Sequence, residues 1–189
     1  MKAALVVFDR ITWLDFIGFY DAVTRLKSMD LMEFSWDVCS TSAPVVDDRG
    51  LRMHPDKVGR PLHGYDMLFV PGGFGTRTLK EDAAFIGWLK TARQTPLKVS
   101  VCTGALLLGA AGYLAGRRAT TNPAAYKELE PYCGSVVKQR VLDEGDIVTA
   151  GGVSASIDLG LHMVKRLAGE EARNRIAAAM DYPYRSMAE

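Results

Sequence analysis

The fold is decided by residues 97–112, which read LKVSVCTGALLLGAAG. Leu97–Val101 is predicted to be a buried strand of a parallel sheet, with apolar Leu97, Val99 and Val101 alternating with Lys98 and Ser100. An apolar helix is expected over Thr103–Ala111. Because no loop separates the two elements, we predict that Cys102 lies on a sharp turn between a strand and a helix of an α/β fold.

Strand and helix patterns alternate along the whole chain. We predict strands at residues 3–8, 34–41, 67–70, 97–101, 118–121, 136–142 and 146–149, with a hairpin of two short strands within 45–53. We predict helices at residues 14–29, 79–93, 103–111, 123–129, 154–167 and 170–180. This order is typical of a three-layer α/β/α sandwich with a mostly parallel, flavodoxin-like central sheet. No linker or repeat divides residues 1–189, so a single domain is expected.

Charge and hydropathy argue against two classes of function. The chain has 23 Lys and Arg against 22 Asp and Glu, so no basic surface for nucleic acid or an anionic membrane is expected. The longest apolar run, Val101–Ala115, is too short to span a bilayer. Residues 1–9 are predicted to contain the first strand rather than a signal peptide, and a cytoplasmic protein is expected.

The three cysteines differ in their surroundings. Their odd number and wide spacing do not fit a disulfide framework or a zinc site, and no metal is expected. Cys39 and Cys133 are expected to be small buried apolar residues. Cys102 is different, because the free N–H groups at the start of the following helix favour a thiolate. We therefore predict a reactive cysteine whose pKa falls below the free value of about 8.5.

Two glycines directly follow the predicted strand 67–70. Gly72 and Gly73 let the backbone turn tightly and point N–H groups beyond the strand end. The Gly73 N–H and the Thr103 N–H are therefore candidate donors of an oxyanion hole, which holds negative charge that develops on a substrate. A Pro-Gly-Gly turn is common by itself, and its pairing with the Cys102 turn is what favours this interpretation.

The first predicted helix, residues 14–29, has Thr12 as a candidate N-cap. Its expected core-facing stripe consists of Leu14, Ile17, Phe19, Ala22 and Leu26. Asp15 lies in the first turn between apolar neighbours. Such a carboxylate either stabilises the helix N-terminus or, when buried near a thiolate, has a raised pKa and exchanges protons.

The histidines do not supply a base for Cys102. His54, His63 and His162 lie away from the predicted strand ends, and His162 falls inside a helix, where a structural role is expected. No Cys-His-Asp triad is therefore predicted. Asp21 and Asp158 also lie on predicted helices and are interpreted as surface or capping residues.

Five motifs together resemble the ThiJ/PfpI superfamily, which shares its fold with the class I glutamine amidotransferases. They are LDFIG at 14–18, VPGGFG at 70–75, VCTGALLLGAAG at 101–112, LAGRRATT at 114–121 and TAGGVSASID at 149–158. The resemblance covers nearly the whole chain, which implies one domain of this type over 1–189. The Cys-Thr-Gly turn and Asp15 look most like the isocyanide hydratase branch and the branch associated with AraC-type regulators.

The resemblance to isocyanide hydratases implies a specific reaction. The Cys102 thiolate would attack the terminal carbon of an isocyanide, and Asp15 would move protons and help water attack the resulting thioimidate. The Gly73 and Thr103 N–H groups would bind the developing charge, and an N-substituted formamide would leave. No metal or organic cofactor is implied, the partner is a small-molecule substrate, and a homodimer is usual in the family.

One position departs from many relatives of this family. Where they carry a histidine near the cysteine, after Arg-Ala-Thr-Thr, this chain has Asn122. An asparagine side chain forms hydrogen bonds but does not act as a general base near neutral pH. The departure therefore disfavours protease-like and amidase-like chemistry more than it disfavours hydration, in which a carboxylate moves the proton.

The candidate pocket residues lie in the turns around Cys102. They are Gly72, Phe74, Gly104 and Asn122, with Trp13, Thr76 and Tyr126 as further positions that would shape the pocket. Two other functions stay open: a glyoxalase-like or deglycase-like activity on reactive carbonyls, and a non-catalytic ligand or redox sensor in which Cys102 is oxidised to sulfenic or sulfinic acid. No basic recognition helix is found, so direct DNA binding is not expected.

Overall fold

The computed structural model describes residues 1–183 and has a seven-stranded sheet at its centre. The strands are β1 (Lys2–Val6), β2 (Ser35–Ser40), β3 (Val45–Val46), β4 (Arg52–Met53), β5 (Lys57–Val58), β6 (Met67–Val70), β7 (Leu97–Val101), β8 (Arg118–Ala119), β9 (Ser135–Val136), β10 (Val141–Asp143) and β11 (Ile147–Ala150). The α-helices are α1 (Trp13–Ser28), α2 (Thr76–Leu79), α3 (Ala83–Leu89), α4 (Gly104–Ala110), α5 (Tyr126–Leu129) and α6 (Ala155–Ala179). Short 3-10 helices are η1 (Lys90–Ala92), η2 (Pro123–Ala125) and η3 (Glu130–Tyr132). The expected domain over 1–189 also includes residues 184–189, which lie outside the described residues.

The strand order confirms the predicted fold class. The order is β10-β11-β7-β6-β1-β2-β5, and all neighbours are parallel except the edge pair of β10 and β11. The central strands therefore follow the flavodoxin-like order, in which the direction of winding reverses beside β1. The predicted hairpin of β3 and β4 is present, and β8 pairs with β9.

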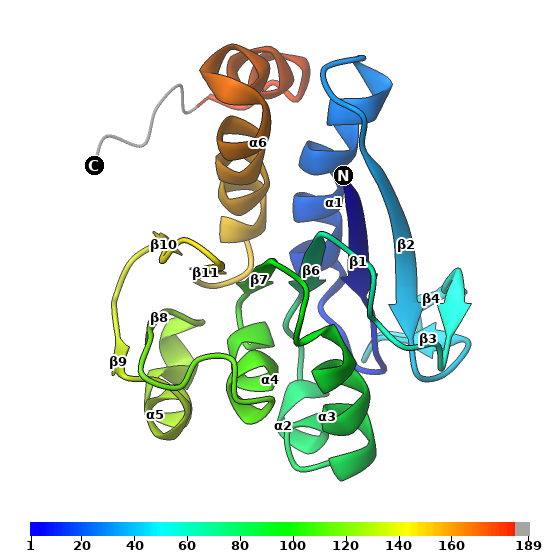
Figure 1. Ribbon diagram of the computed structural model, residues 1–189, viewed down its shortest axis with the longest axis vertical. Helices are drawn as coiled ribbons and strands as arrows, with labels where there is room; N and C mark the ends of the chain where they lie inside the picture. Colours follow the sequence, from blue (N-terminus) through cyan, green and yellow to red (C-terminus); the bar gives the residue numbers. More distant parts are fainter. Residues whose placement is uncertain (184–189) are drawn as a thin grey trace.

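Helices cover both faces of the sheet (Figure 1). Helices α1 and α6 pack side by side on one face, while α4 packs against α2, β6 and β7 on the other. This arrangement gives the three predicted layers. The predicted break in the last helical stretch is also present, because Gly169 has a φ of 90° inside α6 and kinks the helix.

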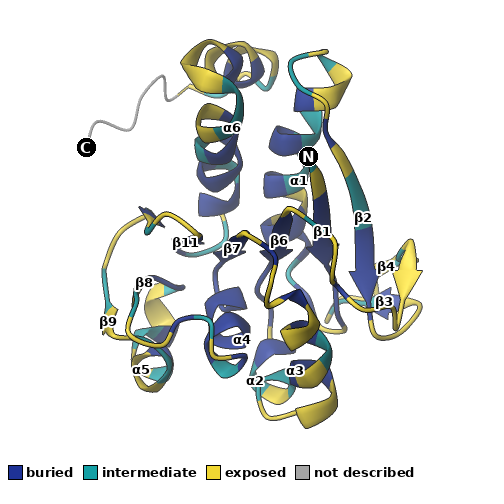
Figure 2. Ribbon diagram, in the orientation of Figure 1, coloured by how far each residue is buried: buried dark blue, intermediate teal, exposed yellow. Residues whose placement is uncertain are grey.

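The core lies on both faces of the central strands (Figure 2). Every residue of β6 and β7 is buried, and in β1 only Lys2 is exposed. These strands are buried along their length because helices cover the sheet on both sides, and in β7 the buried residues include the polar side chains of Lys98 and Ser100. The rings of Phe19 and Phe69 stack with centroids 3.8 Å apart, which fixes α1 over β6.

Two expectations for α1 were wrong. Leu14 and Ile17 are 50% and 44% exposed rather than in the core, because this end of the helix turns its Asp15 side toward the sheet. Thr12 precedes the helix, but its side chain makes no capping hydrogen bond. The Thr12 N–H instead donates to the Gly72 carbonyl at 2.9 Å.

The predicted helix over residues 79–93 is broken rather than continuous. The break falls between α2 and α3, because the Asp82 carboxylate accepts the N–H groups of Ala84 and Phe85 and so caps a new helix. The predicted helix over 123–129 is a 3-10 turn followed by α5. The short edge strand β5 was not predicted.

Candidate active site

The carboxyl ends of β1, β6 and β7 meet at one edge of the sheet. The three strands are neighbours, and the segments after them lead to Asp15, Gly72 and Cys102. In open α/β sheets, binding sites form at this edge beside the point where the strand order reverses. The structure thus brings together the three segments that the sequence singled out.

Cys102 has the strained backbone that its predicted turn requires. Its φ of 55° lies in the left-handed region, which is unfavourable for a residue with a Cβ. The Cys102 N–H donates to the carbonyl oxygens of Ala150 and Gly151, at 3.0 and 2.8 Å. The buried Thr121 hydroxyl donates to the Cys102 carbonyl at 2.7 Å. These hydrogen bonds from neighbouring segments hold the strained turn.

Two glycines let the backbone close tightly around Cys102. A Cβ on Gly104 would lie 2.1 Å from the Val70 carbonyl oxygen, which confirms the crowding expected at this turn. A Cβ on Gly72 would lie 2.8 Å from both Asp15 Oδ2 and Cys102 Cβ. A side chain at either position would therefore displace its surroundings, because a packed interior has no spare volume.

Asp15 is fully buried beside Cys102. Its Oδ2 accepts the Gly72 N–H at 3.0 Å, and its Oδ1 has no regular hydrogen bond within residues 1–183. Burial penalises the carboxylate and raises the pKa of Asp15 to about 7, against the lowering effect of hydrogen bonds with the Cys102 thiol and the Gly72 N–H. Near neutral pH, both the carboxylic acid and the carboxylate are therefore populated.

The expectation of a lowered pKa for Cys102 was wrong. Burial raises the pKa of the thiol to about 11, and the negative charge of Asp15 also raises it. The Thr103 N–H and the Asn122 amide act in the opposite direction, but they do not outweigh burial. Because two negative charges are disfavoured here, a thiolate forms most readily while Asp15 carries the proton.

One of the two expected oxyanion donors is already engaged. The Gly73 N–H donates to the Thr103 hydroxyl oxygen at 3.1 Å, and that hydroxyl donates back to the Gly73 carbonyl at 3.2 Å. The expectation of a free Gly73 N–H was therefore wrong. The Thr103 N–H faces the Cys102 sulfur, as an oxyanion donor requires.

Asn122 lies within hydrogen-bond distance of the sulfur. Its Nδ2 donates to Cys102 Sγ at 3.5 Å. Its Oδ1 accepts the Ala124 N–H at 3.0 Å, so the side chain is also the N-cap of η2. The sequence identified Asn122 as a pocket candidate, and in the structure its amide contacts the Cys102 sulfur directly.

Sequence reasoning missed the role of Thr121. This side chain is fully buried, and its hydroxyl holds the carbonyl of the strained Cys102. The signal that was available is its place at the end of the LAGRRATT motif, residues 114–121. Nothing in that motif indicates which backbone group the hydroxyl contacts.

The remaining pocket candidates differ in exposure. Phe74 is 62% exposed, and the Arg10 guanidinium lies 6.0 Å from the centre of its ring. Trp13 is nearly buried, and its Nε1 donates to a backbone carbonyl at 3.3 Å. The Thr76 hydroxyl is buried and donates to a backbone carbonyl, so it is not available to a substrate. Tyr126 is half-buried.

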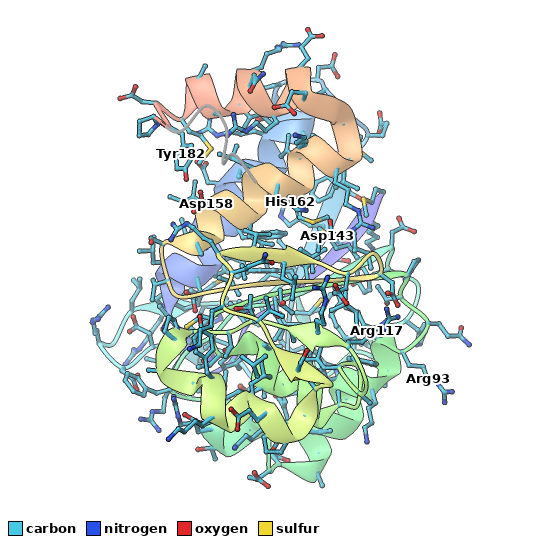
Figure 3. The ribbon with its side chains drawn as sticks, turned by 90° about the vertical axis from the view of Figure 1, so that its left-hand side faces the viewer. Arg93, Arg117, Asp143, Asp158, His162 and Tyr182 are labelled. Carbon is cyan, nitrogen blue, oxygen red and sulfur yellow. The ribbon has the colours of Figure 1, made fainter. Side chains whose placement is uncertain are left out.

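The three histidines take no part in the hydrogen bonds of Cys102. His162 Nε2 lies 2.7 Å from Asp143 Oδ2, in keeping with its predicted structural role (Figure 3). His54 and His63 are exposed. Among the described residues, the side chains that hydrogen-bond to the Cys102 thiol therefore belong to a carboxyl group and an amide and not to an imidazole.

Asp158 was expected to be a surface or capping residue; it lies in the first turn of α6, but not at the surface. It is buried, with Arg140 Nε donating to it at 2.6 Å and the Tyr182 hydroxyl also bonded to it (Figure 3). The pairing explains the burial, because a charged carboxylate leaves water only when it is paired and hydrogen-bonded. Asp21 fits its prediction, since it is half-exposed and paired with Arg25 at 3.0 Å.

All three cysteines are free; Cys39 is buried, as predicted, whereas Cys133 is only partly buried. Within residues 1–183, no three His, Cys, Asp or Glu side chains are grouped in a way that could bind a metal ion. Over the same range, every helix is too short or too polar to cross a membrane.

The fold and the site define an α/β protein with a strained cysteine and a buried carboxyl group at the carboxyl edge of a flavodoxin-like sheet. The sequence pattern of the DJ-1/PfpI family matches residues 1–166. The chain belongs to this family, which confirms the resemblance to ThiJ/PfpI proteins.

Three relatives show how the chain compares with known members. An isonitrile hydratase of Pseudomonas putida is 33% identical over 184 residues, covering 96% of this chain and 78% of the relative. The HTH-type transcriptional regulator CdhR of Pseudomonas aeruginosa is 30% identical over 162 residues, covering 82% of this chain and 48% of the regulator. A crystal structure of a ThiJ/PfpI family protein from Pseudomonas syringae has a TM-score of 0.87 at 27% identity, covering 100% of this chain and 77% of that one.

Proposed function

We propose that this chain hydrates isocyanides, also called isonitriles, to N-substituted formamides, with Cys102 as nucleophile and Asp15 as proton carrier. The observation that carries the proposal is the fully buried Asp15 carboxyl group beside the sulfur, with its pKa raised to about 7. A group whose pKa lies near the working pH both donates and accepts protons efficiently. The 33% identity to an isonitrile hydratase supports this substrate class.

The first step joins the sulfur to the isocyanide carbon. The Cys102 thiolate attacks the terminal carbon of R–NC, and the electron pair left on that carbon takes the proton of the Asp15 carboxylic acid. The product is the thioimidate R–N=CH–S–Cys102, with Asp15 as carboxylate. The step starts from protonated Asp15, which is the form that burial favours and that does not repel the thiolate.

The second step adds water to the same carbon. The Asp15 carboxylate takes a proton from water as the water oxygen attacks, and passes that proton to the nitrogen to give R–NH–CH(OH)–S–Cys102. Breaking the C–S bond then releases R–NH–CHO and the Cys102 thiolate, while the hydroxyl proton returns to Asp15. The sum is one isocyanide plus one water giving one formamide, with both residues restored.

In this mechanism, Thr103 supplies the backbone donor near the developing charge. The Thr103 N–H faces the sulfur, whereas the Gly73 N–H is used to hold the Thr103 hydroxyl. Gly73 therefore positions Thr103 and does not bind the substrate directly. This assignment replaces the two-donor oxyanion hole expected from the sequence.

Formamide production from an aromatic isocyanide, measured by chromatography, tests the proposal. The wild type should form the N-aryl formamide, and Cys102→Ala and Asp15→Asn should each lower kcat/KM by at least about 10²-fold. Cys39→Ala is the matched control, because it removes another buried thiol, and should keep the wild-type rate. Undiminished turnover in Cys102→Ala or Asp15→Asn would rule out the mechanism.

The same protein preparations separate the two alternatives. Absence of isocyanide turnover together with Cys102-dependent loss of methylglyoxal would favour a reactive-carbonyl enzyme. Absence of both activities together with ready oxidation of Cys102 by peroxide would favour a sensor.

We also propose that the chain forms a homodimer through the first turns of α1. Leu14 and Ile17 are half-exposed apolar side chains on neighbouring turns of that helix, and such a pair is stabilised when a second copy covers it. Light scattering should give the mass of a dimer, and Ile17→Glu should shift it toward the monomer. A monomeric wild type would contradict this assignment.

A further inference from the structure

The Cys102 sulfur has a second side-chain neighbour that does not titrate. We propose that Asn122 is a fixed hydrogen-bond donor that stabilises the Cys102 thiolate and leaves Asp15 as the sole proton carrier of the site. The inference deepens the proposed function and rests on its choice of Cys102 as the reacting group.

The orientation of the Asn122 amide is fixed by its capping bond. The Ala124 N–H requires an acceptor, and Asn122 Oδ1 provides it at 3.0 Å. An amide turned over would place its NH₂ group against that N–H, and η2 would lose its cap. Nδ2 is therefore the atom that faces Cys102 Sγ, at 3.5 Å, and it presents N–H groups to the sulfur.

The space for this amide is provided by a glycine on another segment. A Cβ on Gly152 would lie 2.7 Å from Asn122 Nδ2. The backbone of Gly152 has no positive φ that would itself require glycine. Room for the Asn122 amide is the reason that the structure offers for glycine at this position.

Among the described residues, the groups that face the sulfur are one titratable group and two fixed donors. Asp15 on α1 is the titratable neighbour, while the Thr103 N–H at the start of α4 and the Asn122 amide favour the thiolate without changing charge. An amide donates at every pH but accepts no proton near neutrality. The thiol proton therefore has one destination, Asp15, which suits electrophiles that need a single proton in each step, as an isocyanide carbon does.

The test separates the donor role of Asn122 from its capping role. Asn122→Asp and Asn122→Ser both keep a good N-cap for η2, but neither keeps an amide N–H aimed at the sulfur. The rate of Cys102 alkylation by iodoacetamide is measured from pH 6 to 10, with the Cys102 peptide identified by mass spectrometry. We expect Asn122→Asp to slow alkylation at pH 8 by at least about tenfold, equivalent to a rise of one pKa unit, with a smaller loss for Asn122→Ser.

Gly152→Ala provides a second way to move the amide without replacing it. Its new Cβ would lie 2.7 Å from Nδ2, so the amide would have to leave the position that it holds 3.5 Å from the sulfur, and alkylation at pH 8 should slow as in Asn122→Ser. Thermal unfolding of each variant shows whether the fold is kept. The proposal is overturned if the folded Asn122→Asp and Asn122→Ser variants keep the wild-type pH profile of alkylation. It is also overturned if Asn122→Ala slows alkylation while Asn122→Asp and Asn122→Ser react at the wild-type rate, because Asn122 would then act only as the N-cap of η2.

The outcome is independent of the substrate. Alkylation reports on the thiolate whether or not isocyanides are turned over. Failure of isocyanide hydration with an altered alkylation profile removes the proposed substrate and leaves the role of Asn122 standing. If isocyanides are hydrated but the alkylation profile of the Asn122 variants is unaltered, the proposed substrate stands and the role of Asn122 is removed.

Discussion

Two cysteines of this protein are buried near the carboxyl ends of parallel strands, and burial raises the pKa of both thiols to about 11. Cys39 is part of β2, and Cys102 directly follows β7. The negative charge of a nearby aspartate also raises the pKa of each thiol; it is Asp37 for Cys39 and Asp15 for Cys102. The pKa of the thiol therefore does not distinguish the candidate nucleophile from the structural cysteine.

The difference lies in the carboxyl groups. Lys2 Nζ lies 2.8 Å from Asp37 Oδ2, and the Tyr65 hydroxyl donates to the same oxygen at 2.7 Å, so the pKa of Asp37 is lowered and it stays charged. The pKa of Tyr65 is raised by burial, so neither group exchanges protons near neutral pH. Among residues 1–183, no cation contributes to the pKa of Asp15, which exchanges protons in that range. What sets the Cys102 site apart is a partner that changes its protonation state.

The largest effect on activity is expected from Gly72→Ala, which separates Asp15 from Cys102 without removing either group. A Cβ there would lie 2.8 Å from both Asp15 Oδ2 and Cys102 Cβ, so one of them must move. Because misplacement of reacting groups by about 1 Å costs on the order of 10²-fold, kcat/KM should fall by about that factor. Steady-state kinetics on the isocyanide substrate measures the loss.

Gly87→Ala is the control for this substitution. Gly87 lies in α3, and a Cβ there would meet nothing within 4 Å. This variant should keep its activity and gain about 0.5–1 kcal/mol of stability, because alanine is the better helix former. Equal activity in the two alanine variants would show that the closeness of Asp15 and Cys102 does not matter.

The next largest effect is expected on the free energy of unfolding of Asp15→Asn at pH 8, compared with wild type by urea unfolding. The pKa of Asp15 rises from 3.8 to about 7 on folding, so the folded state favours the protonated carboxyl. The stability that this group provides is present below the unfolded pKa and is lost as pH rises through about 7. Asparagine carries no charge at any of these pH values, so the variant does not lose stability as the pH rises. At pH 8 it should therefore be more stable than wild type by roughly 2–4 kcal/mol.

Asp37→Asn should change stability in the opposite direction. The pKa of Asp37 is lowered in the folded protein, so its contribution is present above the unfolded pKa and is lost as pH falls through the folded value. The ion pair with Lys2 is partly exposed, so the variant should lose less than about 1 kcal/mol at pH 8. Shifts of the same sign in the two asparagine variants would contradict the contrast between the carboxyl groups.

The fold and the members of the site follow from local patterns in the sequence. The segments that end at Val70 and Val101 are predicted to be buried parallel strands, and the topology of such sheets brings their carboxyl ends together. Asp15, Gly72 and Cys102 could therefore be placed in one site before any contact was known.

The electrostatics of the site could not be predicted in the same way. The helix start after Cys102 is visible in the sequence, and it favours a lower thiol pKa. The amount of protein that covers the sulfur is not visible, and burial decides the sign of the shift. The partner of the Gly73 N–H and the aim of the Asn122 amide likewise depend on contacts between segments that are distant in sequence.

A further effect on stability is expected from the backbone that carries each cysteine. The Cys39 carbonyl lies in a regular strand and accepts the Val7 N–H at 2.9 Å, whereas the carbonyl of the strained Cys102 is held by the Thr121 side chain. Thr121→Val keeps the shape of the side chain but removes this bond. Because a buried carbonyl then loses its partner, the free energy of unfolding should fall by about 1–3 kcal/mol.

Thr95→Val shows whether that loss comes from the hydrogen bond or from the substitution itself. The Thr95 hydroxyl is also buried, but within residues 1–183 it has no hydrogen-bond partner. Removing an unpaired buried hydroxyl costs no hydrogen bond and relieves its desolvation, so this variant should be as stable as wild type or slightly more stable. If urea unfolding gave equal losses for the two valine variants, the Thr121 bond would not be what holds the Cys102 turn. If Thr121→Val alone also slowed alkylation of Cys102, the bond would act on the position of the sulfur as well as on the fold.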